Sequence, residues 1–417
     1  MVHGEAWTLK EFFVYPNEYI YWSIQIVMYP FMTGLVAGAF VLSSLYHVFG
    51  VKQLKEIARF SLVFSLALLP VAMMPLMLHL MQPQRGIYVM LTPHFTSAIA
   101  AFGIVFTTYG FIVASEIWFV YRQFIVETVM ELRAKQQRSA VESARLILYT
   151  LLSMGAMDLS PEALHKDERA VGILAGIGIP VACFLHGYAG FIFGSVKANA
   201  LWMTPLMPVI FICSAIVSGI ALCIATYIIT MEIRKLIYAR KRRYNPDLPS
   251  TEELKSAEIH VVTMTAKYLV MFLVLAITLE LLDLIFRTYT AVKSWDILRN
   301  VIYERDFFKI FILQYGLGNL VPFIIFLWPG LTIRRALIGT FLVLMGVFMM
   351  RWNVVIGGQA FSASFSGFME YQLPIWPGSV EFFKEGLFGA LAVITTPFVL
   401  FYLITWVLPV FGVKDSH

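Results

Sequence analysis

Long runs of apolar residues, separated by short polar stretches, set the pattern of this chain. The runs cover residues 20–48, 57–81, 95–121, 170–195, 204–232, 260–287, 307–328, 334–354 and 384–411. Each run has about the 20 residues that an α-helix needs to cross the hydrocarbon core of a bilayer. The pattern therefore predicts an all-α, polytopic transmembrane protein with nine spans.

A further apolar stretch at 143–160 decides between nine spans and ten. Its run "LILYTLLSMGAM" is short for a crossing, which favours a helix at the membrane interface. Nine spans place every basic stretch on one side, namely 49–59, 122–145, 233–259 and the turn at 334–335, whereas a tenth would split them. The positive-inside rule makes this side cytoplasmic. Loop 355–383 and the N-terminus are then expected outside, and the C-terminus inside.

The composition supports a membrane protein and argues against a nucleic-acid partner. Apolar residues make up 59% of the chain and charged residues only 14%, about half the share of a soluble protein. The formal net charge of +5 comes from residues in the loops between the spans. The sequence shows no basic stretch with interleaved aromatic residues of the kind that binds nucleic acid.

The Cys and His positions predict a chain without metal centres of its own. Cys183, Cys213 and Cys223 lie inside apolar runs, at spacings that match no zinc or iron–sulfur motif. Of the eight histidines, only His79 and His186 lie well within spans, whereas His47 and His260 lie at span ends, and no span carries two histidines about four turns apart. We therefore expect neither an iron–sulfur cluster nor haem in this chain.

Polar and ionisable side chains gather where several spans end on the predicted outer side. Such residues are costly near hydrocarbon, so they indicate a functional site by default. They come from the turn 78–98 and from the ends of spans four, six and eight: His79, Gln82, Arg85, His94, His186, Tyr188, Glu280, Asp283, Arg287, Arg351 and Asn353. We expect them to form one cluster near the outer face.

These residue types match the needs of a quinone head group. Its two carbonyl oxygens require hydrogen-bond donors, and its reduction takes up two protons. We expect donors and stabilising charge from His79, Arg85, His94, His186 and Tyr188. Glu280 and Asp283 are the candidate proton carriers, because burial and neighbouring charges shift carboxyl pKa values.

Each member also has a plain structural interpretation. Arg85, Arg287 and Arg351 fit the pattern of arginines that anchor helix ends at the interface. Glu280 and Asp283 would then serve to pair with them, and His186 would be a packing histidine.

Several segments resemble the polysulfide-reductase/NrfD family of quinone-interacting membrane proteins. They are "GLVAGAFVLSSLYHVFG", "HLMQPQRGIYVMLTPHFTSAIAAFG", "LHGYAGFIFGSVKANALWMTPLMPVIFICSAIVSGIAL" and "RWNVVIGGQ". Within the family, the first two look closest to the DsrP-type subunit of a redox complex that serves dissimilatory sulfite reduction. One departure is "MQPQR", where many relatives have a "GRP"-like turn, so Gln82 stands at the polar step.

The resemblance implies two four-helix bundles, here 1–200 and 201–417, with a C-terminal helix and the outer loop 355–383 in the second. It also implies a menaquinone-type site near the outer face, lined by His79, Arg85, His94, His186 and Tyr188. The implied partners are an extracytoplasmic, ferredoxin-like iron–sulfur subunit and further membrane and cytochrome subunits. The aromatic stretch "FMEYQLPIWPGS" of the outer loop is suited to docking the iron–sulfur partner.

The function expected on these grounds is that of an integral subunit of a multi-subunit oxidoreductase in the cytoplasmic (inner) membrane. It would exchange electrons and protons between the quinone pool and the clusters of its partner, in dissimilatory sulfur metabolism. Two other functions remain open at this stage. One is a transporter or proton-translocating subunit without a redox role, and the other is a structural membrane anchor.

Overall fold

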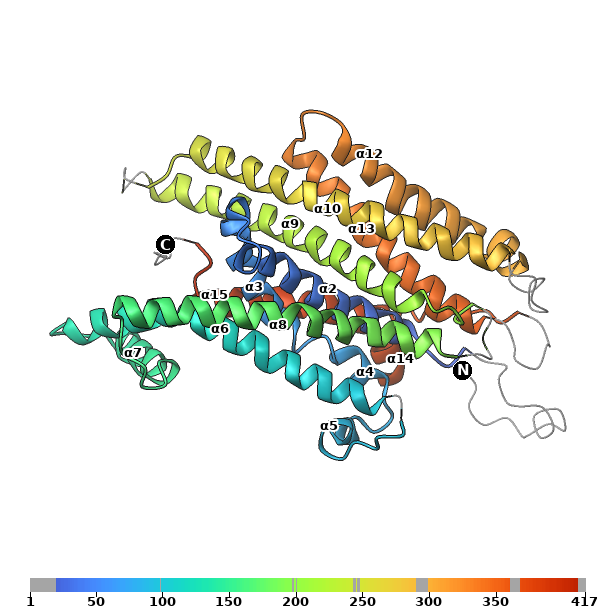
Figure 1. Ribbon diagram of the computed structural model, residues 1–417, viewed down its shortest axis with the longest axis horizontal. Coiled ribbons are helices and arrows are strands. Elements are labelled where there is room, and N and C mark those ends of the chain that lie inside the picture. Colours follow the sequence, from blue (N-terminus) through green and yellow to red (C-terminus); the bar gives the residue numbers. More distant parts are fainter. Residues whose placement is uncertain are drawn as a thin grey trace.

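The computed structural model describes residues 20–97, 99–196, 199, 201–242, 245, 248–289, 299–360 and 368–411. Within these ranges the apolar runs are helical, and the helices lie side by side in one elongated bundle (Figure 1). Eight of them are long and apolar enough to cross a membrane. They are α2 (Ile24–His47), α6 (Ala100–Ala134), α8 (Pro161–Gly194), α9 (Met207–Lys241), α10 (Thr251–Tyr289), η4 with α12 (Phe308–Leu320 and Val321–Leu327), α13 with η5 (Ile333–Trp352 and Asn353–Gly357), and α15 (Leu387–Val407). The protein is therefore a polytopic helical membrane protein, as predicted.

The predicted second span is the exception, because it is not one continuous helix. It is divided into α3 (Lys55–Leu68) and α4 (Met74–His79), with a turn between them. Pro70 lies in this turn, and proline lacks the N–H group that an uninterrupted helix would need there. The two pieces still connect opposite ends of the bundle, since Glu56 of α3 contacts Tyr227 of α9, whereas His79 contacts Glu385 beside the start of α2.

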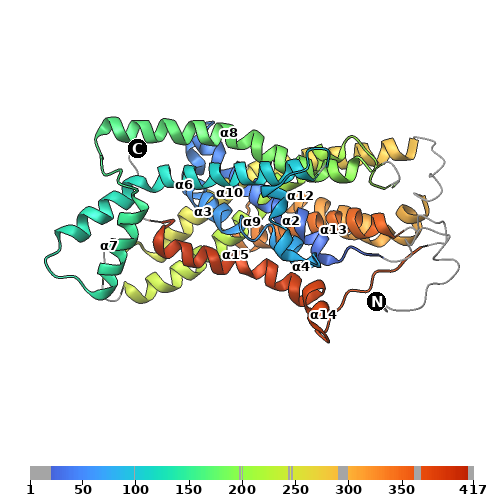
Figure 2. The same ribbon diagram turned by 90° about the horizontal axis from the view of Figure 1, so that it is seen from below.

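The stretch expected to lie at the interface forms α7 (Ala140–Leu152), a helix of only 13 residues. Ser139 and Glu142 cap its first turn reciprocally. Figures 1 and 2 show α7 at one end of the bundle, where it packs against α6. We call this the basic end, because the connections that carry the Lys and Arg residues of 49–59, 122–145 and 233–259 lie here.

Helix α2 lies at the centre of the molecule, and the other helices surround it (Figures 1 and 2). Every residue from Ile24 to Ser44 is buried. Gly38 allows the close contact with α9, because a Cβ atom there would lie 2.8 Å from the Cα atom of Gly219. Small residues at such crossings let membrane helices pack through their backbones.

The helices fall into two groups, one that packs around α2 and one that packs around α9. Helices α3, α8 and α9 pack on α2, and α6 packs on α8. On the other side α10 and α13 pack on α9, and η4 packs on α13, while α15 packs on α3. One large apolar core runs through both groups. The division into domains at residue 200 stays a prediction.

A second, smaller apolar cluster closes the end opposite to the basic end. Trp22, Phe193 and Trp202 pack their rings together there, and Trp22 stacks on Trp202 with a centroid distance of 5.3 Å. Phe211 and Met350 belong to the same cluster. These apolar side chains cover the polar network described next.

Candidate functional site

Arg351, near the C-terminal end of α13, is the centre of a buried polar network. Its side chain is fully buried, with 0% exposure. Its Nη2 atom donates to His186 Nε2 at 2.9 Å and to Ser214 Oγ at 2.7 Å. The guanidinium also lies 3.7 Å from the centre of the Phe211 ring, within the range of a cation–π interaction. This burial excludes the interpretation of Arg351 as an anchor at the membrane interface.

His186 of α8 is held in one tautomer by its neighbours. Arginine only donates, so the Nε2 atom of His186 must accept from Arg351, and the ring proton then resides on Nδ1. That atom lies 3.4 Å from the Thr33 hydroxyl of α2. Gly34 makes room for the ring, because a Cβ atom there would lie 3.1 Å from His186 Cε1. Both ring nitrogens therefore face partners within the protein.

Glu280 of α10 joins the network through two amide side chains. Its Oε2 atom accepts from Gln314 Nε2 at 3.0 Å and from Asn319 Nδ2 at 3.4 Å. Gln314 accepts in turn from Asn353 Nδ2 at 2.8 Å. The charges of Glu280 and Arg351 are close enough to interact. These contacts connect α10, η4, α13 and α8 across the interior.

Asp283, one helical turn beyond Glu280, has partners of its own. It accepts from Thr204 Oγ1 at 2.6 Å and from Arg287 Nε at 2.7 Å. The pair Asp283–Arg287 is the carboxylate–arginine contact that the structural interpretation of the sequence anticipated. Glu280 differs, because amides rather than arginines bond its carboxylate.

A small cavity lies beside these carboxylates, with a volume of about 110 Å³. Glu280, Asp283, Arg287, Asp306, Gln314 and Asn353 supply its polar lining. One water needs about 10–15 Å³ of such volume, so several waters fit there. Typical ligand pockets of roughly 300–1,000 Å³ are much larger. The cavity is therefore suited to several waters and to proton transfer, and it is smaller than a typical ligand pocket.

Three π-helical segments surround this cavity and explain how its amides meet. They are η3 (Asn300–Arg305), η4 and η5. In an α-helix, residues five apart such as Gln314 and Asn319 would lie about 140° apart around the axis. The i→i+5 register of a π-helix brings them toward the same face, where both reach Glu280. A periodicity of 3.6 residues per turn leaves Gln314 and Asn319 as scattered polar positions and does not bring them together at Glu280.

A second polar cluster lies at the same end but nearer the surface. His79 Nδ1 is 3.0 Å from Glu385 Oε2, and the two side chains are 24% and 25% exposed. Ser23, the N-cap of α2, also donates to Glu385. Glu385 ends α14 (Val380–Glu385), immediately before the apolar run of the last span. That position is the only sequence signal for it.

Tyr371 adjoins this second cluster. Its hydroxyl oxygen accepts from the backbone N–H of Ile24 at 3.0 Å. Burial raises the pKa of the Tyr371 phenol to about 12, and the Glu385 carboxylate adds to the rise, while the bond from Ile24 opposes it. The phenol therefore keeps its proton at neutral pH. Tyr371 also contacts the ring of Trp352, next to Arg351, with a centroid distance of 5.6 Å.

The turn at 78–98 does not join the buried network, contrary to the prediction of a single cluster. Arg85 lies in the short helix η2 (Pro83–Arg85) and is exposed. His94 is also exposed, and its Nδ1 atom is 2.7 Å from the Thr96 hydroxyl. The turn follows the broken second span to the periphery, where Figure 1 shows α5 (Tyr88–Leu91) at the edge of the bundle, far from α10 and α13.

The remaining predicted donor, Tyr188, is half-buried on α8. Its ring packs between Phe184 and Phe191, with centroid distances of 5.7 and 5.5 Å. Of the predicted residues, the structure thus unites His186 with Arg351, and Glu280 with Asp283 around one cavity. His79 lies in the second cluster, while Arg85 and His94 lie apart. The assignment of quinone ligands made from the sequence stays a prediction for all five residues: His79, Arg85, His94, His186 and Tyr188.

In the described ranges, no group of three or more His, Cys, Asp or Glu residues could hold a metal ion. The fold and the site together define a multi-pass helical membrane protein with a buried acid–amide–arginine network at one end. The chain belongs to the polysulphide reductase, NrfD family, whose model matches residues 15–363. This match includes both polar clusters except for Glu385 and Tyr371.

Two curated proteins are similar to part of this chain. A selenate reductase subunit from Mesobacillus selenatarsenatis is 29% identical over 218 residues, which cover 51% of this chain and 49% of that protein. A protein named as a "Putative dimethyl sulfoxide reductase membrane subunit", from Halobacterium salinarum, is 26% identical over 209 residues, 50% of this chain and 43% of its own length. The chain thus spans about half the length of the curated relatives it matches.

Proposed function

We propose that this chain is the membrane subunit of a multi-subunit oxidoreductase in the cytoplasmic membrane. It exchanges electrons and protons between a menaquinone-type quinone and the iron–sulfur clusters of a partner subunit. Membership of the NrfD family supports the proposal, as do the two relatives whose names describe reductase subunits. The observation that carries it is the partly exposed His79–Glu385 pair at the same end as a buried network that includes a carboxylate.

The residues of the second cluster fit a quinone head. His79 presents an imidazole at the protein surface, and about a quarter of it is exposed. Tyr371 uses its oxygen to accept from Ile24, which leaves its hydroxyl hydrogen to donate to a carbonyl oxygen. The Glu385 carboxylate contacts both Ser23 and His79, so it orients the imidazole toward the head group. A bound quinone would supply the two-electron, two-proton chemistry.

The buried network holds the charge and protons that this chemistry needs. The two amides occupy Oε2 of Glu280, so Oε1 is the atom that takes a proton. Arg351 stabilises the carboxylate when Glu280 is ionised, and His186 and Ser214 hold Arg351 in place. The cavity beside Glu280 and Asp283 has room for the waters that deliver protons.

The proposed partner is an iron–sulfur subunit that docks on the outer loop. In the described part of this loop Ile375 is 65% exposed and Trp376 is 78% exposed. Phe382 and Phe383 of the adjoining α14 are each 45% exposed. Exposed aromatic residues of this kind are enriched in protein interfaces. The docking surface would then lie beside the His79–Glu385 pair, which keeps the electron path short.

Finer assignments follow the sequence resemblance. We assign the chain to the DsrP-type branch and to dissimilatory sulfur metabolism, on the segments around Gly34–Gly50 and His79–Gly103. Further membrane and cytochrome subunits would complete the complex. A transporter or a structural anchor would use the same fold without binding quinone, so quinone binding separates these functions.

The test is binding of a quinone analogue, an alkyl-hydroxyquinoline N-oxide, to the purified chain in lipid nanodiscs. Saturable binding by the wild type, weakened in His79→Ala, is the expected result. His94→Ala is the matched control, because this exposed histidine lies in the same segment. Absence of saturable binding, or equal weakening by both substitutions, would contradict the proposal.

A further inference from the structure

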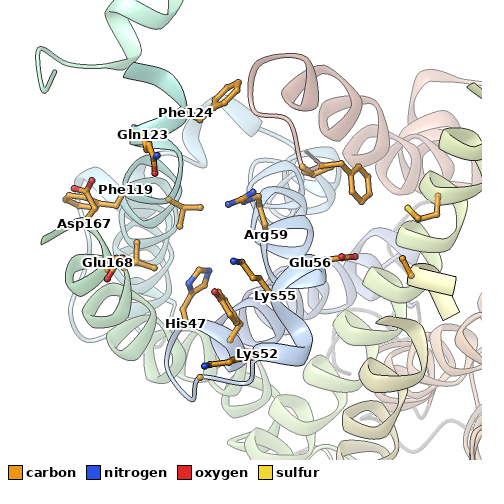
Figure 3. Close-up of a pocket in the computed structure, with 18 of the residues that line it drawn as sticks. His47, Lys52, Lys55, Glu56, Arg59, Phe119, Gln123, Phe124, Asp167 and Glu168 are labelled. Carbon is orange, nitrogen blue, oxygen red and sulfur yellow. The ribbon is translucent and has the colours of Figure 1, made fainter. Parts of the chain in front are cut away.

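A large cavity lies at the basic end, away from both polar clusters. Its volume is about 830 Å³. It lies between the end of α2, helix α3, and the neighbouring turns of α6 and α8, and Figure 3 shows it as an open space between these helices. This is a size typical of a ligand site.

One wall of the cavity is cationic. Lys52, Lys55 and Arg59 follow one another at spacings of three and four residues along η1 (Lys52–Leu54) and α3, so they share a helix face. Figure 3 shows Lys55 and Arg59 projecting from α3 into the space, with His47 and Lys52 below them. The side chain of Lys52 makes no hydrogen bond or ion pair with the described residues.

The carboxylates that line the cavity are bonded to other groups. Asp167 forms an ion pair with Arg122 at 2.6 Å, and Glu56 accepts from the Tyr227 hydroxyl at 3.3 Å. Glu253 accepts from the backbone N–H of Ser250 at 2.8 Å, and Glu168 faces His165 at 3.4 Å. Arg122 is outside the lining, so the charge of Asp167 is balanced from elsewhere.

The opposite wall is largely apolar, although Gln123, Asp167 and Glu168 of α6 and α8 also line it. It is formed by side chains of α6, α8 and the segment after α15: Phe119, Val120, Phe124, Leu164, Val171, Val410 and Phe411. A cationic face opposite an apolar face matches an amphiphile that has an anionic head and hydrocarbon chains. Basic pockets between membrane helices on the cytoplasmic side bind phospholipid head groups in this way.

We propose that this cavity binds a phosphate-ester anion, with the phosphate on Lys52, Lys55 and Arg59. A phospholipid of the cytoplasmic leaflet is the source that best suits the apolar wall. The bound lipid would join α3 to α6 and α8, and so would brace the broken second span at the end opposite to the quinone site. This proposal does not depend on the redox function.

The first experiment measures the phospholipid that stays bound to the full-length chain after extensive detergent washing, by native mass spectrometry. The triple variant Lys52→Gln, Lys55→Gln, Arg59→Gln should lose the bound phospholipid. Each basic residue near an anionic lipid contributes about 1 kcal/mol, so its affinity should fall roughly 100-fold. The control triple Lys135→Gln, Arg240→Gln, Lys255→Gln changes the charge equally at exposed positions outside the cavity, and should retain the lipid.

The second experiment identifies the source of the anion. The unfolding temperature of the delipidated wild type is measured with phosphatidylglycerol micelles and, separately, with inorganic phosphate. Stabilisation by the micelles alone supports a lipid, and stabilisation by phosphate alone supports a soluble anion in the same site. Stabilisation by neither, or equal lipid retention in both triple variants, overturns the proposal. If the cavity triple does not fold, Lys52→Gln alone is compared with Lys135→Gln by the same criterion.

Discussion

The polar turn at 79–94 and the polar positions within α8, α10 and α13 look alike in the sequence, since both interrupt apolar runs. The structure separates them. Arg85 and His94 in the turn are exposed, whereas His186 and Arg351 on packed helices are completely buried and bonded to each other. A polar group on a packed helix needs a partner in the protein, while one in a loop can be solvated.

This difference shows where polarity in a membrane chain indicates function. The turn's residues can change without leaving a buried charge uncompensated. The helix-borne residues form a network in which the removal of one member leaves several donors or acceptors unsatisfied. The contrast between the two regions is therefore open to direct tests by substitution.

The largest effect is expected from Arg351→Gln. The substitution removes the buried cation that bonds His186 and Ser214 and balances Glu280. Each hydrogen bond from a charged donor contributes about 1.5–3 kcal/mol, and Arg351 donates to both His186 and Ser214. The unfolding temperature of the purified protein in detergent measures the effect, with Arg85→Gln as control. Equal unfolding temperatures for both variants would show that the buried arginine is dispensable.

A smaller effect is expected from Glu385→Gln, which weakens the pair with His79 and the contact to Ser23. The loss of one hydrogen bond to a buried or half-buried group costs about 1–3 kcal/mol. Binding of the quinone analogue should therefore weaken by roughly 5- to 150-fold. Glu381→Gln, an exposed carboxylate on the same short helix, is the control. Undiminished binding in Glu385→Gln would place the quinone elsewhere.

Gly34→Ala tests how tightly α2 packs against His186. The added Cβ atom would lie 3.1 Å from the ring, so the histidine must shift by a few tenths of an ångström. We expect destabilisation of about 1 kcal/mol, at the low end for overpacking. Gly176→Ala, with no neighbouring atom within 4 Å of the new Cβ, should be neutral or stabilising. The unfolding temperatures of both variants test this expectation. A lower unfolding temperature for Gly176→Ala than for Gly34→Ala would show that α2 is not tightly packed against His186.

The smallest effects are expected in the turn itself. Arg85→Gln and His94→Ala alter exposed side chains, and such changes usually stay within about 0.5 kcal/mol. Stability and analogue binding should both match the wild type within error. A loss of analogue binding in either variant would show that the turn contributes to the site. The distinction between the exposed turn and the buried residues on the helices would then be wrong.

The spans could be predicted because a helix that crosses the bilayer needs a minimum length and a high mean hydropathy. Both are properties of the whole segment, so single polar residues do not hide them. Hydropathy alone did not show that the second span breaks at Pro70, although the proline was visible. The grouping of His186, Glu280 and Asp283 near one end followed from depth along each helix.

Contacts between segments that are distant in the chain could not be predicted from the sequence. Glu385 lies 306 residues from His79, and nothing in either segment specifies the other. Gln314 and Asn319 meet Glu280 only through a π-helical register. The exposed position of Arg85 depends on how the broken span directs the chain, which local polarity does not encode.

In the proposed function the buried network handles the protons of quinone chemistry, and Glu280 is the carrier. The most direct test is the rate of menaquinol-linked electron transfer in the assembled complex carrying Glu280→Gln. Glutamine retains acceptor capacity for Gln314 and Asn319 but cannot take up a proton at Oε1. We expect unchanged assembly and analogue binding, with a rate lowered by roughly 100-fold or more, whereas Glu370→Gln on the exposed loop should keep the wild-type rate. A Glu280→Gln complex that binds quinone and turns over at the wild-type rate would show that Glu280 does not carry these protons.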